Sequence, residues 1–113
     1  MKINQLVNKA HCNAKTKGFW EDYSSLENME LKPFYQDMSN NAIGNRLMLI
    51  TGEVAEAHEA LRKEDWDNFK EELADIVIRV ADLAGGLYID LEEEITKKME
   101  KNALRPYKHG KKF

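Results

Sequence analysis

Four carboxylates stand in two pairs with the same internal spacing, Glu53 with Glu56 and Glu72 with Asp75. A step of three residues separates the members of each pair by about 4.5 Å of rise on one face of a helix. Carboxylates that are held together and partly desolvated repel one another, so a cation is their natural partner. Ligands that are all oxygen suit Mg²⁺ or Mn²⁺, and Mg²⁺ commonly completes its shell with water and substrate phosphates. The pattern therefore predicts a divalent metal site that binds a polyphosphate.

The acidic pairs need rigid elements to position them, and the apolar pattern predicts two. Apolar residues recur in alternating steps of four and three over residues 43–61 and again over residues 69–87. This is the spacing of a coiled-coil-like seam. A polar turn at residues 62–65 joins the two segments, which predicts a long antiparallel helical hairpin. Asn40 or Asn41 is the expected N-cap of its first helix.

Both acidic pairs are symmetric about this turn. Glu56 and Glu72 are centred on position 64, and so are Glu53 and Asp75. Residues equidistant from the turn of an antiparallel hairpin lie at the same height, and packed helices lie about 8 to 10 Å apart. We therefore expect the four carboxylates to converge. For either pair alone the alternative is a solvated helix face, because Glu and Asp are ordinarily exposed.

The remaining elements are shorter. A thin apolar stripe predicts a first helix over roughly residues 2–17, and residues 18–40 show no sustained period and are expected to form a long connection. A further helix is expected to begin with Asp90 as its N-cap and to stop before Pro106. The basic tail at residues 107–113 is expected to be mobile without ligand.

Composition favours one soluble, all-α domain over residues 1–113, a bundle-like fold of four to five helices. Apolar residues make up 42% and charged residues 33% of the chain, and the net charge is −3. An acidic chain lacks the basic patch of a protein that binds polymeric nucleic acid. Cys12 is the only cysteine, which favours a reducing, cytoplasmic compartment. No apolar stretch approaches the roughly 20 residues that span a bilayer, so we expect no membrane partner.

The acidic motifs resemble those of a known family, the MazG-like all-α nucleoside triphosphate pyrophosphohydrolases. The signature of that family is E-x-x-E, a spacer and E-x-x-D, and here fifteen residues separate the two motifs. The similarity covers about residues 43–110 and includes residues 86–93 and the K-M-E-K-N run that ends at Asn102. The resemblance implies Mg²⁺-dependent cleavage of the α,β-phosphoanhydride of an NTP or dNTP, with a nucleoside monophosphate and pyrophosphate as products. It also implies a homodimer or homotetramer.

The resemblance implies roles for individual residues. Glu53 or Glu56 would be the catalytic base, and Mn²⁺ would be able to substitute for Mg²⁺. The metal ligands would be Glu53, Glu56, Glu72 and Asp75, the phosphate would contact Lys98, Asn102 and Arg105, and the base would contact His11 and Trp20. In an oligomer, the last two groups would be able to serve the carboxylates of a neighbouring subunit. For the phosphate contacts, the alternative is a lysine-rich, solvated helix end. For the base contacts, the alternatives are a surface histidine at position 11 and a core tryptophan at position 20.

One position departs from the family pattern. Arg79 stands where the deoxycytidine-triphosphatase branch commonly carries Tyr, so the preferred base stays open. Arg79 is expected to contact phosphate or a carboxylate, or to form a surface ion-pair set with Asp75 and Asp82. Two other classes of protein compete with the enzyme. One is a noncatalytic helical interaction module, and the other is a di-iron bundle, which needs Glu-x-x-His motifs that His58 does not provide.

Overall fold

The computed structural model describes residues 1–26 and 34–112, and no strand occurs among them, so the all-α prediction is confirmed. Within these ranges no helix is both long enough and apolar enough to cross a membrane. The described elements are α1 (Ile3–Thr16), α2 (Glu21–Ser25), α3 (Tyr35–Arg62), α4 (Trp66–Gly86), α5 (Leu91–Ala103) and the 3-10 turn η3 (Tyr107–Gly110).

Side-chain caps mark the points where α4 and α5 begin. The Asp65 carboxylate accepts a hydrogen bond from the backbone N–H of Asn68 at 3.1 Å. The Asp90 carboxylate accepts one from the backbone N–H of Glu93, also at 3.1 Å. Such caps pair a backbone donor that the first helical turn leaves without a partner. The predicted N-cap at Asp90 is confirmed.

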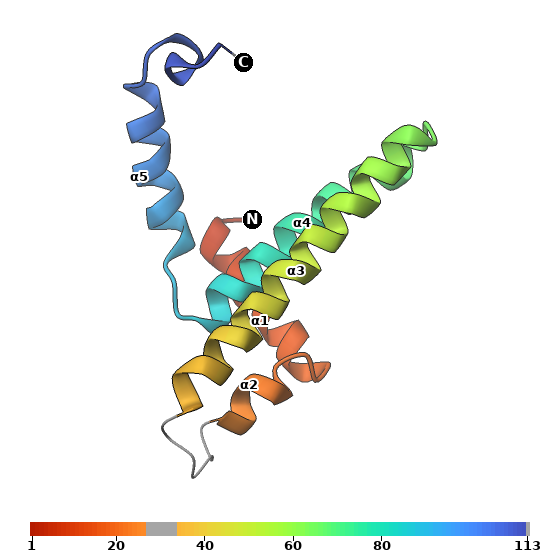
Figure 1. Ribbon diagram of the computed structural model, residues 1–113, viewed down its shortest axis with the longest axis vertical. Coiled ribbons are helices and arrows are strands. Elements are labelled where there is room, and N and C mark those ends of the chain that lie inside the picture. Colours follow the sequence, from red (N-terminus) through yellow and green to blue (C-terminus); the bar gives the residue numbers. More distant parts are fainter. Residues whose placement is uncertain (27–33, 113) are drawn as a thin grey trace.

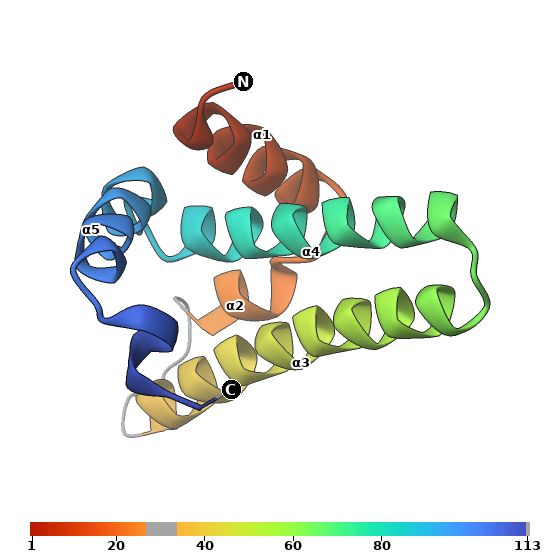
Figure 2. The same ribbon diagram turned by 90° about the horizontal axis from the view of Figure 1, so that it is seen from above.

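Helices α3 and α4 lie side by side and run in opposite directions, joined at residues 63–65 (Figure 2). Helix α1 packs on the side of α4 that faces away from α3, and α2 lies beside α3 (Figures 1 and 2). Helix α5 follows the other end of α4 and points away from the α3–α4 pair (Figure 1). The α3–α4 pair is thus the frame that carries the other elements.

The contact between α1 and α4 is built from small side chains, which let the two helices approach closely. No large side chain is fully buried in the described part of the chain. The buried cluster consists of Val7, Ala10, Ala81 and Ala84. The core of a single chain is therefore thin.

The first long helix begins earlier than the sequence predicted. Helix α3 begins at Tyr35, so Asn40 and Asn41 lie inside it and do not cap it. Ser39 is buried, and α2 packs against α3. Tertiary packing therefore extends the helix through a polar stretch whose own helix propensity is weak.

The predicted connection at residues 18–40 also contains regular structure, because α2 forms within it. Residues 27–33 of this connection lie outside the described residues. In the basic tail, Lys108 and His109 adopt positive φ angles of 56° and 54° inside η3. Both segments therefore contain short elements that no sustained sequence period reveals.

One face of the α3–α4 pair is apolar and exposed. Val54 directly follows Glu53 on α3, and Leu73 directly follows Glu72 on α4. Each apolar side chain therefore points about 100° around its helix from the preceding glutamate, in the same sense along the chain. Because the helices are antiparallel, both rotations lead to the same face of the pair. About half of each large side chain in this apolar face is exposed, namely in Leu47, Val54, Leu61, Leu73 and Val77.

Candidate metal centre and adjoining pocket

Three of the four motif carboxylates come together between α3 and α4. One oxygen each of Glu53, Glu56 and Glu72 lies within 4.8 Å of the others. Two of these side chains come from α3 and one from α4, whereas the symmetry about position 64 predicts two from each helix. We call these three side chains the carboxylate cluster.

Asp75 does not belong to this group of three within the described residues. Asp75 is exposed and lines the adjoining pocket together with Glu53. The expected convergence of four carboxylates therefore holds for three of them, with the fourth at the pocket wall.

The crowded carboxyl groups alter one another's proton affinity. Partial burial, which is the largest cause, and the neighbouring carboxyl groups of Glu53 and Glu56 raise the pKa of Glu72 to about 7. A hydrogen bond from Arg79 holds the pKa of Glu53 below its usual range. A proton on Glu72 and the guanidinium beside Glu53 thus reduce the repulsion within the cluster.

Arg79 pairs with the carboxylate cluster across the two helices. Its Nε donates a hydrogen bond to Oε1 of Glu53 at 2.8 Å. The surface ion-pair set of Arg79 with Asp75 and Asp82 does not form among the described residues, where Arg79 pairs with Glu53 instead. The Arg79 side chain thus connects α4 to Glu53 on α3.

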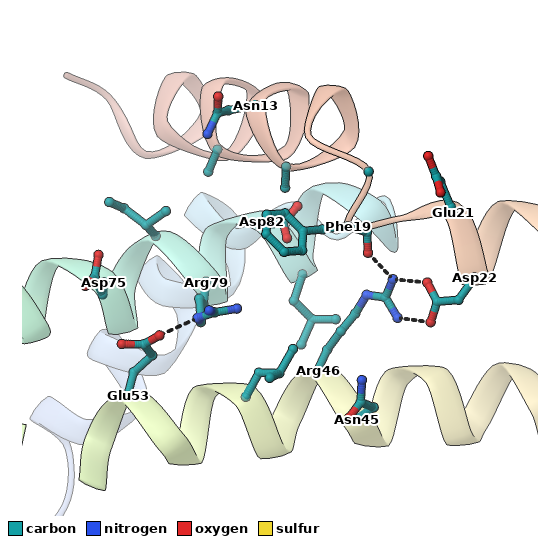
Figure 3. A pocket seen from close by; sticks show the side chains of 16 residues that line it. Asn13, Phe19, Glu21, Asp22, Asn45, Arg46, Glu53, Asp75, Arg79 and Asp82 are labelled. Carbon is teal, nitrogen blue, oxygen red and sulfur yellow. Dashed lines mark hydrogen bonds and ion pairs between the residues drawn. The ribbon is translucent and has the colours of Figure 1, made fainter. Parts of the chain in front are cut away.

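A pocket of about 640 Å³ adjoins Glu53 (Figure 3). Its walls come from α1, from α2 and the segment before it, and from α3 and α4. Glu53 and Arg79 lie on one side of it, and Phe19 and Arg46 lie on another (Figure 3). Polar side chains that line it include Asn13, Asn45, Arg46, Asp75, Arg79 and Asp82.

Arg46 holds this pocket wall together through several hydrogen bonds. It is 8% exposed, and its guanidinium donates to both carboxylate oxygens of Asp22, at 3.2 and 2.7 Å. It also donates to the backbone carbonyl of Phe19 at 2.9 Å and covers the Trp20 ring at 4.0 Å from the ring centre. The hydrogen bond from Arg46 lowers the pKa of Asp22. Arg46 therefore joins α3 to α2 with most of its donors in use.

His11 and Trp20 meet at a residue that we did not assign to the site. Trp20 Nε1 donates to Oδ1 of Asp82 at 2.7 Å, and His11 Nδ1 lies 3.0 Å from the same oxygen. The two rings contact edge to face with their centres 5.0 Å apart. Trp20 is 3% exposed and does not line the pocket, whereas Asp82 and Phe19 do.

The sequence offered one signal for Asp82, which follows Asp75 by seven residues and so shares its helix face. Its partners are 71 and 62 residues away in the chain, and no local pattern indicates them. The base contacts of His11 and Trp20 stay a prediction. In this structure these two rings support the pocket wall from behind, through Asp82.

The three expected phosphate contacts lie on or just beyond α5, away from the carboxylate cluster. Lys98, Asn102 and Arg105 do not line the pocket beside Glu53. Oδ1 of Asn102 is buried without a hydrogen-bond partner among the described residues. The roles of these side chains stay a prediction, and within one chain they do not meet the carboxylates.

Fold and site together define an all-helical protein with an acidic centre between two antiparallel helices and a polar pocket beside it. The sequence matches the MazG nucleotide pyrophosphohydrolase domain over residues 44–109, a range that contains all four motif carboxylates. The chain therefore belongs to the family of MazG nucleotide pyrophosphohydrolase domains, as its motifs predicted. No curated protein and no solved structure matched the chain.

Proposed function

We propose that this protein hydrolyses the α,β-phosphoanhydride of a nucleoside triphosphate or deoxynucleoside triphosphate. The products are a nucleoside monophosphate and pyrophosphate, and the required cofactor is Mg²⁺, with Mn²⁺ as a substitute. The observation that carries the proposal is the carboxylate cluster, in which oxygens of Glu53, Glu56 and Glu72 lie within 4.8 Å of one another. The pocket beside it, about 640 Å³ in volume, is in the range of small-molecule sites.

The cluster fits a hard divalent cation. Its donors are all carboxylate oxygens, which Mg²⁺ and Mn²⁺ prefer. Oε2 of Glu72 is buried and has no hydrogen-bond partner in the described part of the chain, so a ligand-binding oxygen is available at the centre. Glu53, Glu56 and Glu72 would hold the cation, and Asp75 would complete the set from the pocket wall.

Each side chain has a separate task in the proposed reaction. A bound divalent cation supplies positive charge to the phosphate oxygens and lowers the pKa of water. A carboxylate must then accept a proton from the attacking water. Arg79 lowers the pKa of Glu53, which makes Glu53 a weaker proton acceptor. This effect applies only while Arg79 is paired with Glu53, so Glu53 and Glu56 both stay candidates for the base.

The nucleoside would occupy the pocket away from the carboxylates. Phe19 is 64% exposed and lines the pocket beside Asn13 and Asn45, so an aromatic face and amide groups are available to a base. His11 and Trp20 would act at the same end, from behind the wall that Asp82 forms. This arrangement does not decide which base is preferred.

The proposed enzyme is a homodimer or homotetramer. The apolar face of the α3–α4 pair supports this assembly, because a monomer would leave five half-exposed apolar side chains there in water. In such an assembly Lys98, Asn102 and Arg105 would contact the triphosphate held by a neighbouring subunit. The same apolar face is the observation that favours the second candidate function, a noncatalytic helical interaction module.

The first test is incubation of the purified protein with each common NTP and dNTP and Mg²⁺, with chromatographic detection of monophosphate and pyrophosphate. We expect release of pyrophosphate, and orthophosphate as the product would contradict the proposed bond. Glu53→Gln, Glu56→Gln and Asp75→Asn should each lower kcat/KM by about 100-fold or more, since each removes a ligand or the base.

Glu71→Gln is the matched control, because Glu71 is exposed, neighbours Glu72 and is not in the carboxylate cluster. Its activity should equal that of the wild type. No turnover of any nucleotide would favour the interaction module. Unchanged activity in one of the cluster variants, with the fold intact, would remove that residue from the catalytic set.

A further inference from the structure

Arg79 is the cation that the fold presents to the carboxylate cluster. Its Nε donates to Oε1 of Glu53 at 2.8 Å, and the Glu53 side chain is largely buried while that of Arg79 is 38% exposed. Among residues 1–26 and 34–112, no second Lys, Arg or His forms an ion pair with a member of the cluster. Arg79 therefore supplies positive charge where a divalent cation would.

Most of the hydrogen-bonding capacity of Arg79 is unused. A guanidinium has five N–H donors, and only Nε of Arg79 finds an acceptor within the described ranges. Arg79 lines the pocket, where its side chain lies beside Glu53 (Figure 3). In the other arginine of the pocket, Arg46, both Nη groups donate hydrogen bonds to protein acceptors. Of the two, Arg79 is the arginine whose Nη groups are both available to a ligand within the described ranges.

We propose that Arg79 alternates between two partners, the Glu53 carboxylate when the cluster holds no divalent cation and the substrate triphosphate when it does. The inference rests on the proposed function and adds a residue to it. The Arg79 guanidinium and a metal ion compete for the same oxygen of Glu53, so binding of one weakens binding of the other. A guanidinium released from Glu53 already lies at the pocket and matches the geometry of phosphate oxygens.

The exchange predicts effects of opposite sign when Arg79 is removed. Binding of a divalent cation without nucleotide should become tighter, because the cation no longer competes with the guanidinium for Glu53. Binding of a triphosphate together with the cation should become weaker, because a charged donor is lost. A residue that merely holds α3 and α4 together would weaken both when substituted.

The test uses the full chain and isothermal titration with two probes, Mn²⁺ alone and the preformed complex of Mn²⁺ with inorganic tripolyphosphate. Tripolyphosphate has no base, so it reports the phosphate contact alone. For Arg79→Gln we expect Mn²⁺ to bind several-fold more tightly than to the wild type. We expect the tripolyphosphate complex to bind at least about tenfold more weakly, as for a lost charge-assisted hydrogen bond.

Two further variants sharpen the result. Arg79→Lys keeps the positive charge but loses the planar guanidinium with its several N–H donors. Its affinities for both probes should therefore lie between those of the wild type and Arg79→Gln. Lys70→Gln removes an exposed positive charge from the same helix and should leave both affinities unchanged. Circular dichroism and thermal unfolding establish that each variant is folded.

The outcomes separate this inference from the function on which it rests. If the wild type binds Mn²⁺ but both affinities fall together in Arg79→Gln, or if its affinity for the tripolyphosphate complex is unchanged, the exchange is wrong and the proposed enzyme stands. If the wild type binds no Mn²⁺, the metal site fails and the exchange fails with it.

Discussion

At the scale of single residues, the carboxylate cluster is an arrangement in which neighbours set one another's charge. Burial and the adjacent carboxyl groups raise the pKa of Glu72 to about 7, while Arg79 lowers the pKa of Glu53. Near neutral pH, Glu53 is therefore ionised and Glu72 is about half protonated. The two glutamates have the same chemistry, and only their surroundings distinguish them.

The raised pKa of Glu72 predicts a pH dependence of stability in the presence of a chelator. The folded state holds this proton more tightly than the unfolded state, whose Glu pKa is about 4.5. The stabilising contribution is thus fully present below about pH 4.5 and is lost as the pH rises through about 7. Denaturant unfolding between pH 4.5 and 8 should show this fall in the wild type.

In Glu72→Gln the same series should be flatter, because the titrating group is absent. The lowered pKa of Glu53 does not produce the fall, since its contribution is present above the unfolded pKa and is lost only as the pH drops below it. A wild-type curve that rises from pH 5 to 7, or an unchanged fall in Glu72→Gln, would contradict the assignment.

At the scale of elements, one close approach ties the segment before α2 to α4. A Cβ atom at Gly86 would overlap the ring of Trp20, so glycine is required there for space. The Nε1 group of the same ring donates to Asp82 one turn earlier in α4. The pocket wall that includes Phe19 and Asp82 therefore depends on the fit of Trp20 against α4.

Gly86→Ala should destabilise the protein by about 1 to 3 kcal/mol, the usual cost of overpacking. Gly44→Ala is the matched control, because Gly44 lies inside α3 with no atom within 4 Å of an added Cβ. Alanine is the better helix former, so this control should be stabilised by up to about 1 kcal/mol. Denaturant unfolding measures both, and equal effects of the two substitutions would show that Trp20 does not constrain α4.

At the scale of the whole molecule, a single chain is less compact than its size predicts. Its accessible surface is 9018 Å², whereas a compact monomer of 13.1 kDa exposes about 6,400 Å². The radius of gyration is 17.1 Å, against about 13 Å for a compact domain of this length. The excess surface of about 2,600 Å² per chain amounts to about 5,200 Å² for two chains, which is at the upper end of the range that obligate homodimers bury.

The proposed assembly predicts that the wild type sediments as a dimer or a tetramer at micromolar concentration. Leu47→Lys combined with Val77→Lys should yield monomers, because both charges fall on the apolar face and both positions are already half exposed in one chain. Lys63→Glu in the turn between α3 and α4, which changes an exposed charge away from the apolar face, should leave the assembly intact. Analytical ultracentrifugation decides the matter, and a monomeric wild type would refute the assembly.

Much of the frame was predictable because it is encoded locally. The seven-residue recurrence of apolar positions indicated the long helices, Asp90 indicated where α5 begins, and the motif spacing indicated carboxylates level across a turn. The extent of α3 was not predictable in the same way. Its first turns are polar, and the helix gains tertiary support from α2, which contacts α3 and pairs with Arg46 through Asp22.

The sequence by itself determined the helical class, the family and the set of four carboxylates, since each depends on residue type and on spacing along one chain. Only the tertiary structure decided that three carboxylates meet while Asp75 turns to the pocket wall, that Arg79 pairs with Glu53, and that Trp20 contacts Asp82. The physical reason is that a helical period indicates which face a side chain occupies, but not the rotation at which two helices meet. That rotation, set by packing over the whole molecule, selects the partner of each charged group.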